Sequence, residues 1–233
     1  RSLGDPNVGQ LNMTNQMDAH LIETKLKGQA LFSGSFLHAF LDTVALPDGT
    51  QATREYVVHP GAVMIIPLLE LPGQPLQLVM ERQFRYPVQQ VMLEFPAGKL
   101  DPNESTLQCA QRELYEETGY VAQTWNVLLD LANTPGGSTE QIRIYFAQDL
   151  SLHPDGRPVG DAEELDMPVH WIPIQDVLES IRRGAVTNPQ LVAGTHAALI
   201  AMAEPDLALR SADAPWHARE DVLGNDRVWL PKN

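Results

Sequence analysis

The sequence predicts an α+β fold in which a small N-terminal antiparallel β-sheet precedes a larger domain of strands and helices. Two observations favour this class. Short segments rich in β-branched and aromatic residues, separated by turn residues, occupy the first part of the chain, and strong helix-forming segments then alternate with further strands. The length of 233 residues suits one domain with a small appendage.

The appendage is expected over residues 1–58, where RSLGDPNVGQ at the start has no regular pattern. LFSGSFLHAFLDTVAL (31–46) is rich in aromatic and β-branched residues and reads as one strand. PDGT (47–50) supplies turn chemistry, and REYVV (54–58) reads as the returning strand. This pattern of strand, turn and strand predicts a small sheet.

The main domain is expected over residues 59–204 and opens with a hairpin of buried strands. A helix of strong helix formers is expected over 104–118, with Gly119 as its C-cap. A Gly-, Pro- and Asp-rich segment at 151–168 predicts a long loop, and the tail at 205–233 has no clear periodicity and no assigned role. The remaining expected elements are strands at 63–70, 76–84, 91–98, 125–133, 141–150 and 168–174, and helices at 174–183 and 190–204.

The charge balance restricts the partners of this chain. Acidic residues outnumber basic ones 30 to 16, which gives a formal charge of -14, and the chain has no basic run. Such a field repels phosphate backbones, so a nucleic-acid partner is not expected. A phosphorylated small molecule would need divalent cations and a few arginines to neutralise it locally.

Cysteine use and hydropathy indicate the compartment. The single cysteine, Cys109, excludes an intrachain disulfide and favours a reducing cytoplasm. The longest apolar stretch, residues 61–69, is far shorter than a membrane span, and the start of the sequence lacks the regions of a signal peptide. We therefore expect a cytoplasmic protein without a membrane partner.

Residues 98–120, GKLDPNESTLQCAQRELYEETGY, carry the chemistry. On the expected helix, Glu113, Glu116 and Glu117 lie within an arc of roughly a third of the circumference, beside an apolar stripe that includes Leu114. Taken alone, such a cluster is more often a solvated acidic face. Crowded carboxylates repel one another unless cations lie between them, and oxygen ligands of this kind suit Mg²⁺ or Mn²⁺.

This segment resembles the Nudix box, GX5EX7REUXEEXGU, in which U is aliphatic. The matching residues are Gly98, Glu104, Arg112, Glu113, Leu114, Glu116, Glu117 and Gly119. Tyr120 replaces the last aliphatic residue. The resemblance implies an α/β/α sandwich with a mixed sheet and a Mg²⁺-dependent pyrophosphohydrolase. It also implies metal binding by Glu113, Glu116, Glu117 and the carbonyl of Ala97, with Glu116 counted among the catalytic residues. From the residues themselves, Arg112 could pair with Glu104.

The sequences flanking the box resemble the ADP-ribose pyrophosphatase branch of the family. The resemblance lies in REYVVHPGAV (54–63), ERQFRYP (81–87), LEFPAGKLD (93–101) and Pro135, sixteen positions after Gly119. It implies cleavage of ADP-ribose to AMP and ribose 5-phosphate. The implied substrate-binding residues are Arg54, Arg82, Arg85, Glu94 and Pro135. Arginine forks suit phosphates, although ordinary ion pairs would explain at least one of these arginines equally well.

Two further expectations follow from this resemblance, and two alternatives to the expected activity remain. Enzymes of the branch are homodimers in which the N-terminal appendage contacts the partner. A glutamate on the loop before the 168–174 strand acts on the attacking water. Counting back from Trp171 lands one residue off both Glu163 and Glu164, and Glu164 is favoured with Glu163 as the alternative.

The alternatives to this activity are hydrolysis of another nucleoside diphosphate sugar, such as ADP-glucose or GDP-mannose, and a non-catalytic nucleotide-binding module.

Overall fold

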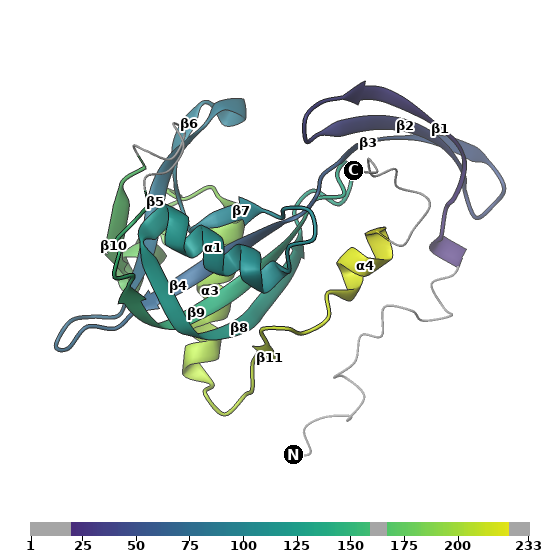
Figure 1. The fold of residues 1–233 in the computed structure, drawn as a ribbon. Coiled ribbons are helices and arrows are strands. Elements are labelled where there is room, and N and C mark those ends of the chain that lie inside the picture. Colours follow the sequence, from purple (N-terminus) through teal and green to yellow (C-terminus); the bar gives the residue numbers. More distant parts are fainter. Residues whose placement is uncertain (1–19, 159–166, 224–233) are drawn as a thin grey trace, which may run out of the picture. The chain divides into compact units, whose positions relative to one another are not determined.

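The computed structural model describes residues 20–158 and 167–223 (Figure 1). The chain divides into two compact units, residues 1–57 and 58–233. The first unit contains a three-stranded sheet and the second an eight-stranded sheet, which confirms the predicted α+β class. The irregular start expected at residues 1–10 lies outside the described residues.

The small sheet consists of β1 (Thr24–Ser33), β2 (His38–Ala45) and β3 (Gln51–Val58) in chain order, with β1 antiparallel to β2. The prediction of a single strand at 31–46 is wrong. The chain turns between β1 and β2, where the N–H of Gly34 donates a hydrogen bond to the carbonyl of Leu37 at 2.8 Å. The polar SGS segment therefore forms a turn within what reads as one apolar run.

The large sheet is mixed, as expected. β4 (Ala62–Leu69) lies at its centre, antiparallel to β5 (Gln77–Arg85) and parallel to β9 (Gln141–Leu152). The path through the sheet is β10-β5-β4-β9-β8-β11, while β6 pairs with β5 and β7 with β4. The other strands are β6 (Gln90–Glu94), β7 (Ala97–Lys99), β8 (Tyr120–Ala132), β10 (Val169–Pro173) and β11 (Arg210–Ser211).

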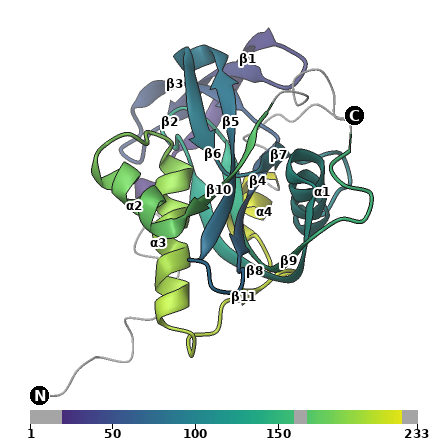
Figure 2. The same cartoon turned by 90° about the vertical axis from the view of Figure 1, so that its left-hand side faces the viewer.

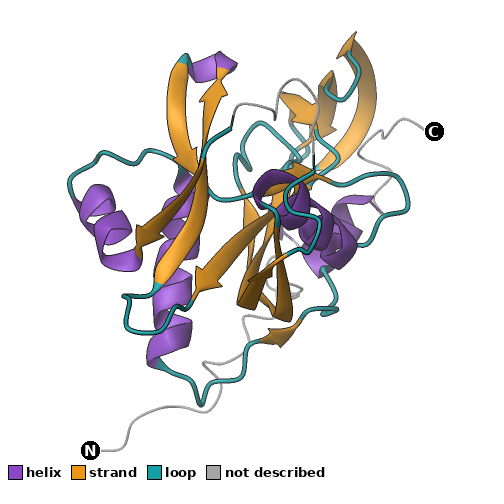
Figure 3. Ribbon diagram, turned by 60° about the vertical axis from the view of Figure 1, so that its left-hand side comes forward, coloured by secondary structure: helices purple, strands orange, loops and turns teal. Residues whose placement is uncertain are grey.

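Helices cover both faces of this sheet (Figures 2 and 3). Successive β4 residues point to opposite faces. Val63 and Ile65 belong to the core beneath α1 (Thr106–Thr118), whereas Met64 and Ile66 belong to the core that includes residues of α2 (Ile174–Arg182) and α3 (Pro189–Ala203). The fully apolar β4 sequence reflects burial on both faces, and the result is the expected α/β/α sandwich.

The helix α1 begins at Thr106, not at Glu104 as predicted. Ser105 caps it: the Ser105 hydroxyl accepts a hydrogen bond from the N–H of Gln108 at 3.2 Å, and the Gln108 side chain accepts one from the N–H of Ser105 at 3.0 Å. Gly119 ends the helix with φ of 75°, which confirms its predicted role. Glu104 lies outside the helix, where its side chain can reach back to α1.

Two strands extend further than the sequence indicates. β8 begins at Tyr120, five residues before the expected start, because Tyr120 pairs with Leu152 at the end of β9. Gln123 and Thr124 interrupt the apolar residues between Tyr120 and Trp125, so no continuous apolar run marks this part of the strand. The loop expected at 151–168 accordingly begins after Leu152, and residues 159–166 of it lie outside the described residues.

The described part of the tail contains regular structure, although the sequence indicated none. β11 pairs with β8, and α4 (His217–Leu223) follows. Trp216 lies between these two elements and is only 5% exposed. Among the described residues, no helix is long and apolar enough to cross a membrane.

The buried guanidinium of Arg143 on β9 holds this tail in place. Arg143 donates to the Asp130 carboxylate at 2.8 Å and to the backbone carbonyls of Ala214 at 2.6 Å and Pro215 at 3.0 Å. The guanidinium also lies over the Trp216 ring, 5.1 Å from its centroid. The tail thus supplies the acceptors that a buried arginine requires.

Replacing Trp216 by alanine should lower the free energy of unfolding by about 3 kcal/mol, because it removes a buried aromatic ring and opens a cavity beside Arg143. Urea denaturation at constant pH measures the change. Leu207→Ala on the same tail is the control, since Leu207 is 64% exposed and should lose less than about 0.5 kcal/mol. Equal stability of Trp216→Ala and the parent protein would contradict the docking of the tail.

Candidate functional site

The acidic face of α1 contains two buried carboxylates and one more accessible carboxylate. Glu113 is 7% exposed and Glu117 is 5% exposed, whereas the side chain of Glu116 is 38% exposed. Buried carboxylates are costly unless they are paired or hydrogen-bonded. The immediate contacts of these three side chains therefore show how the fold maintains this face.

The short strand β7 lies directly against Glu113 and Glu117. A Cβ atom placed on Gly98 would lie 1.7 Å from Oε1 of Glu113, so only glycine permits this approach. The neighbouring N–H of Ala97 donates a hydrogen bond to Oε2 of Glu117 at 2.9 Å. The backbone of β7 therefore positions two of the three carboxylates.

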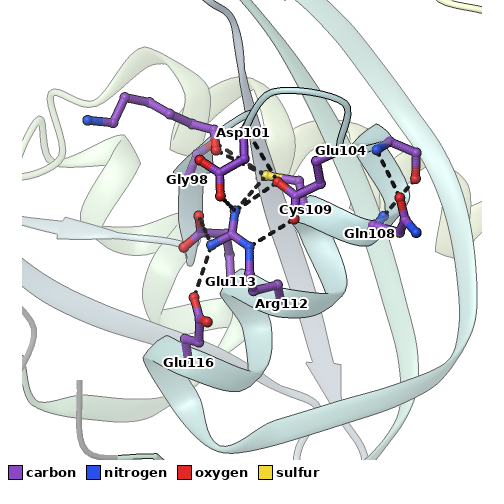
Figure 4. A network of polar contacts seen from close by, with 10 residues as sticks. Gly98, Asp101, Glu104, Gln108, Cys109, Arg112, Glu113 and Glu116 are labelled. Atoms are coloured by element: carbon purple, nitrogen blue, oxygen red, sulfur yellow. Dashed lines mark hydrogen bonds and ion pairs between the residues drawn. The ribbon is translucent and has the colours of Figure 1, made fainter. Parts of the chain in front are cut away.

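Arg112 connects the rest of this network (Figure 4). Its guanidinium donates to both oxygens of Glu104, at 2.8 and 2.9 Å, which confirms the predicted pair. Nη1 of the same group donates to Glu113 at 2.8 Å and to Glu116 at 3.0 Å. The hydrogen bond from Arg112 also lowers the pKa of Glu104. Arg112 thus ties the loop before α1 to the acidic face.

Cys109 lies beneath this network, and its surroundings indicate a structural role. Its thiol is fully buried and points at the carbonyl of Lys99, with 3.3 Å between Sγ and the oxygen. Burial raises the pKa of the thiol, which keeps it protonated and unreactive at neutral pH.

The residues at this face fit a divalent cation. Glu113, Glu116, Glu117 and the Ala97 backbone offer oxygen donors only, the type that Mg²⁺ and Mn²⁺ prefer. Within residues 20–158 and 167–223, no three acidic, histidine or cysteine side chains already surround a common point. Glu113 and Glu116 also form ion pairs with Arg112, whose positive charge partly balances theirs.

Arg85 and Glu94, both expected to bind substrate, form an ion pair on the β5–β6 hairpin. Arg85 donates from Nε at 3.0 Å and from Nη2 at 2.6 Å to the two oxygens of Glu94. Glu94 is buried, whereas the Arg85 side chain is 44% exposed. The pair therefore presents a fixed guanidinium to solvent.

Glu81 is a site residue that the sequence analysis missed. Its Cα pairs with that of Glu94 across the hairpin, and the residue is only 1% exposed. Burial, followed by the negative charge of Glu94, raises the pKa of Glu81 to about 7. The sequence feature that could have revealed it is an acidic residue directly after the apolar run LVM. Glu81 is two residues after the core-facing Val79, so both side chains point to the same face of the strand.

Arg157 is a second missed residue and joins the β9–β10 connection to α1. Its Nε donates to the carbonyl of Glu116 at 3.2 Å and its Nη1 to the carbonyl of Met167 at 2.9 Å. Gly119 lies against it, since a Cβ there would be 2.9 Å from the backbone nitrogen of Arg157. An arginine within a Gly- and Pro-rich loop carried no sequence signal for this contact.

The other expected site residues lie elsewhere. Arg54 belongs to the small sheet and forms an ion pair with Glu23. Arg82 is exposed on β5, and Pro135 is exposed in the turn between β8 and β9. Glu163 and Glu164 lie outside the described residues.

Comparison with known proteins identifies the family. The family model described as NUDIX domain matches residues 58–193. The chain belongs to the Nudix family. As a Nudix hydrolase it is an enzyme, and Nudix ADP-ribose pyrophosphatases generally depend on a divalent metal ion.

The similar proteins match different shares of the chain. An ADP-ribose pyrophosphatase of Mycobacterium tuberculosis (strain ATCC 25618 / H37Rv) is 36% identical over 216 residues, which cover 91% of this Nudix chain and 99% of the relative. A GDP-mannose pyrophosphatase of Cronobacter sakazakii is 32% identical over 104 residues, or 44% of this chain and 52% of the relative. The crystal structure of an ADP compounds hydrolase superposes with a TM-score of 0.68 at 22% identity, over 80% of this chain and 97% of that chain, and shows the fold alone.

Replacing Gly98 by alanine should lower the turnover of this hydrolase by roughly 100-fold, because the added methyl group displaces the Glu113 carboxylate. Steady-state kinetics measures the rate, and circular dichroism verifies that α1 remains folded. Full activity in the folded variant would show that this close approach is not needed.

The metal-free protein should become less stable as the pH rises from about 4.5 to about 7. The pKa of Glu81 is about 7 in the folded protein, against 4.5 for the ordinary group. The stabilisation from the protonated carboxyl group is therefore fully present below pH 4.5 and is lost as the pH rises through 7. Relative to Glu81→Gln, which cannot ionise, the parent protein should lose about 2 kcal/mol across this window.

Urea denaturation in EDTA at several pH values measures this difference. The charged groups that face Glu81 are present in both proteins, so the comparison isolates the contribution of Glu81; they are Glu94, Arg85, Arg157 and Glu113. A stability difference that does not vary with pH would exclude the raised pKa.

Proposed function

We propose that this enzyme hydrolyses the diphosphate of ADP-ribose to AMP and ribose 5-phosphate with Mg²⁺, Mn²⁺ being the alternative cation. One observation carries the substrate: the relative that matches along 99% of its length is an ADP-ribose pyrophosphatase. The acidic face of α1 supports the chemistry, because its carboxylates are oxygen donors for a metal ion. Glycine at position 98 allows the backbone of β7 to approach the Glu113 carboxylate closely.

Glu113, Glu116, Glu117 and the Ala97 carbonyl are the proposed metal ligands. When bound there, Mg²⁺ polarises phosphoryl oxygens and lowers the pKa of a water ligand. Gly98 and the N–H of Ala97 orient Glu113 and Glu117 for this role. Arg112 balances the same carboxylates by its hydrogen bonds to Glu113 and Glu116.

Arg85 is the proposed contact to the substrate diphosphate, because Glu94 holds its guanidinium in a bidentate pair that leaves the side chain 44% exposed. Arg54, Arg82 and Pro135 are proposed to make further substrate contacts. Glu164, with Glu163 as the alternative, is proposed to orient or deprotonate the attacking water.

The small sheet, as part of an appendage spanning residues 1–58, is the proposed dimer contact. Residues 59–204 then form the catalytic domain, and residues 205–233 form an extension whose described part packs on β8 and β9. We propose a homodimer that acts on a nucleoside diphosphate sugar in a reducing cytoplasm, without a nucleic-acid or membrane partner. The charge of -14 disfavours a nucleic-acid partner, and the single cysteine supports the reducing compartment.

A second candidate is hydrolysis of another nucleoside diphosphate sugar. The similarity to a GDP-mannose pyrophosphatase favours it, although that similarity covers 44% of the chain against 91% for the ADP-ribose pyrophosphatase. Parallel assays with ADP-ribose, ADP-glucose and GDP-mannose separate the two candidates. Faster turnover of GDP-mannose than of ADP-ribose would overturn the proposed substrate.

Replacing Glu117 by glutamine should reduce AMP release from ADP-ribose by roughly 100-fold or more, because the variant loses a charged metal ligand. Chromatographic quantification of AMP and ribose 5-phosphate at saturating Mg²⁺ measures the effect. Glu204→Gln, an exposed change of equal charge at the end of α3, is the control and should turn over normally. Unchanged turnover by Glu117→Gln would contradict the metal assignment.

A further inference from the structure

The orientation of β5 places the Glu81 side chain under the acidic helix. Side chains alternate along a strand, so Glu81 shares a face with Val79 and not with Met80. Val79 packs in the core cluster that contains Leu114 and Cys109 of α1, whereas Met80 packs in the opposite core. Glu81 therefore lies on the α1 side of the sheet.

One oxygen of the Glu81 carboxyl group has no partner. The residue is 1% exposed, and its Oε2 is buried without a hydrogen bond from any described residue. Transfer of a carboxyl oxygen from water to such a place is unfavourable unless something compensates it. An apolar residue would fill this strand position without that penalty, which indicates that the carboxyl group has a use.

Charged groups surround Glu81, and one of them, Glu113, belongs to the candidate metal site. Glu113 of α1 and Glu94 of β6 act on it with negative charge, and Arg85 and Arg157 act with positive charge. Both arginines already have acceptors: Arg85 has Glu94, and Arg157 has the carbonyls of Glu116 and Met167. Glu117 and Glu81 also both act with negative charge on Arg85, which therefore lies near both carboxylates.

We propose that Glu81 is a further metal-binding residue of this centre and contributes its buried Oε2 to a divalent cation beside Glu113. Carboxylate oxygens are the ligands that Mg²⁺ and Mn²⁺ take. This inference rests on the proposed metal-dependent function and adds to it a ligand from β5, outside residues 98–120.

Binding of Mn²⁺ alone tests the proposal without turnover. Electron paramagnetic resonance of free Mn²⁺, titrated with the full chain at fixed pH, gives the dissociation constant and the number of bound ions. Glu81→Gln should bind Mn²⁺ at least roughly tenfold more weakly, or should bind one ion fewer. Glu70→Gln removes an exposed carboxylate just beyond the end of β4 and should bind like the parent protein.

Mn²⁺ affinity and ion number in Glu81→Gln equal to those of the parent protein would overturn the proposal. Thermal unfolding in EDTA verifies folding, and Glu81→Gln should be at least as stable as the parent, since it no longer buries an ionisable group. Glu81→Asp, which keeps the charge, should bind more tightly than Glu81→Gln, and equal weakening in both variants would show a packing effect only.

Glu117→Gln separates this inference from the proposed function in the same titration. Loss of Mn²⁺ binding in Glu117→Gln, together with normal binding in Glu81→Gln, would leave the metal centre in place and exclude Glu81 from it. Normal binding in both variants would exclude the metal centre itself.

Discussion

The contact between β7 and α1 is the constraint on which the acidic face depends. The backbone at Gly98 passes so close to Glu113 that no side chain fits between them, and the adjacent N–H of Ala97 holds Glu117. These contacts require β7 to pair with β4 in register, because Val63 of β4 is opposite Gly98. The centre of the large sheet thereby sets the position of two carboxylates.

Charge compensation explains how so acidic a chain keeps this arrangement. The formal charge is -14, and two arginines near the site are held by carboxylates. Arg112 is bound by Glu104, Glu113 and Glu116, and Arg85 is bound by Glu94. Fixed ion pairs of this kind lose little further side-chain entropy when a charged substrate binds, since the guanidinium groups are already oriented.

The buried Arg143 on β9, the strand parallel to β4, is likewise held by acceptors. It gathers Asp130 and two tail carbonyls around one guanidinium and stacks on Trp216. Tyr145, also on β9, shares a hydrogen bond of 2.7 Å with Thr106 in the first turn of α1 and donates one of 3.0 Å to Ala212 of the tail. The tail and α1 are therefore connected through β9.

The sequence by itself determined the α+β class, the extent of most helices and strands, and the acidic helix with its pairing of Arg112 and Glu104. These depend on local periodicity, helix capping and short separations along the chain, which neighbouring residues encode. Only the tertiary structure decided that Glu81 lies under α1, that Arg157 joins the β9–β10 connection to Glu116, and that the tail binds Arg143. Each of these contacts joins segments far apart in the chain, and its partner is set by strand order and register, which no local pattern encodes.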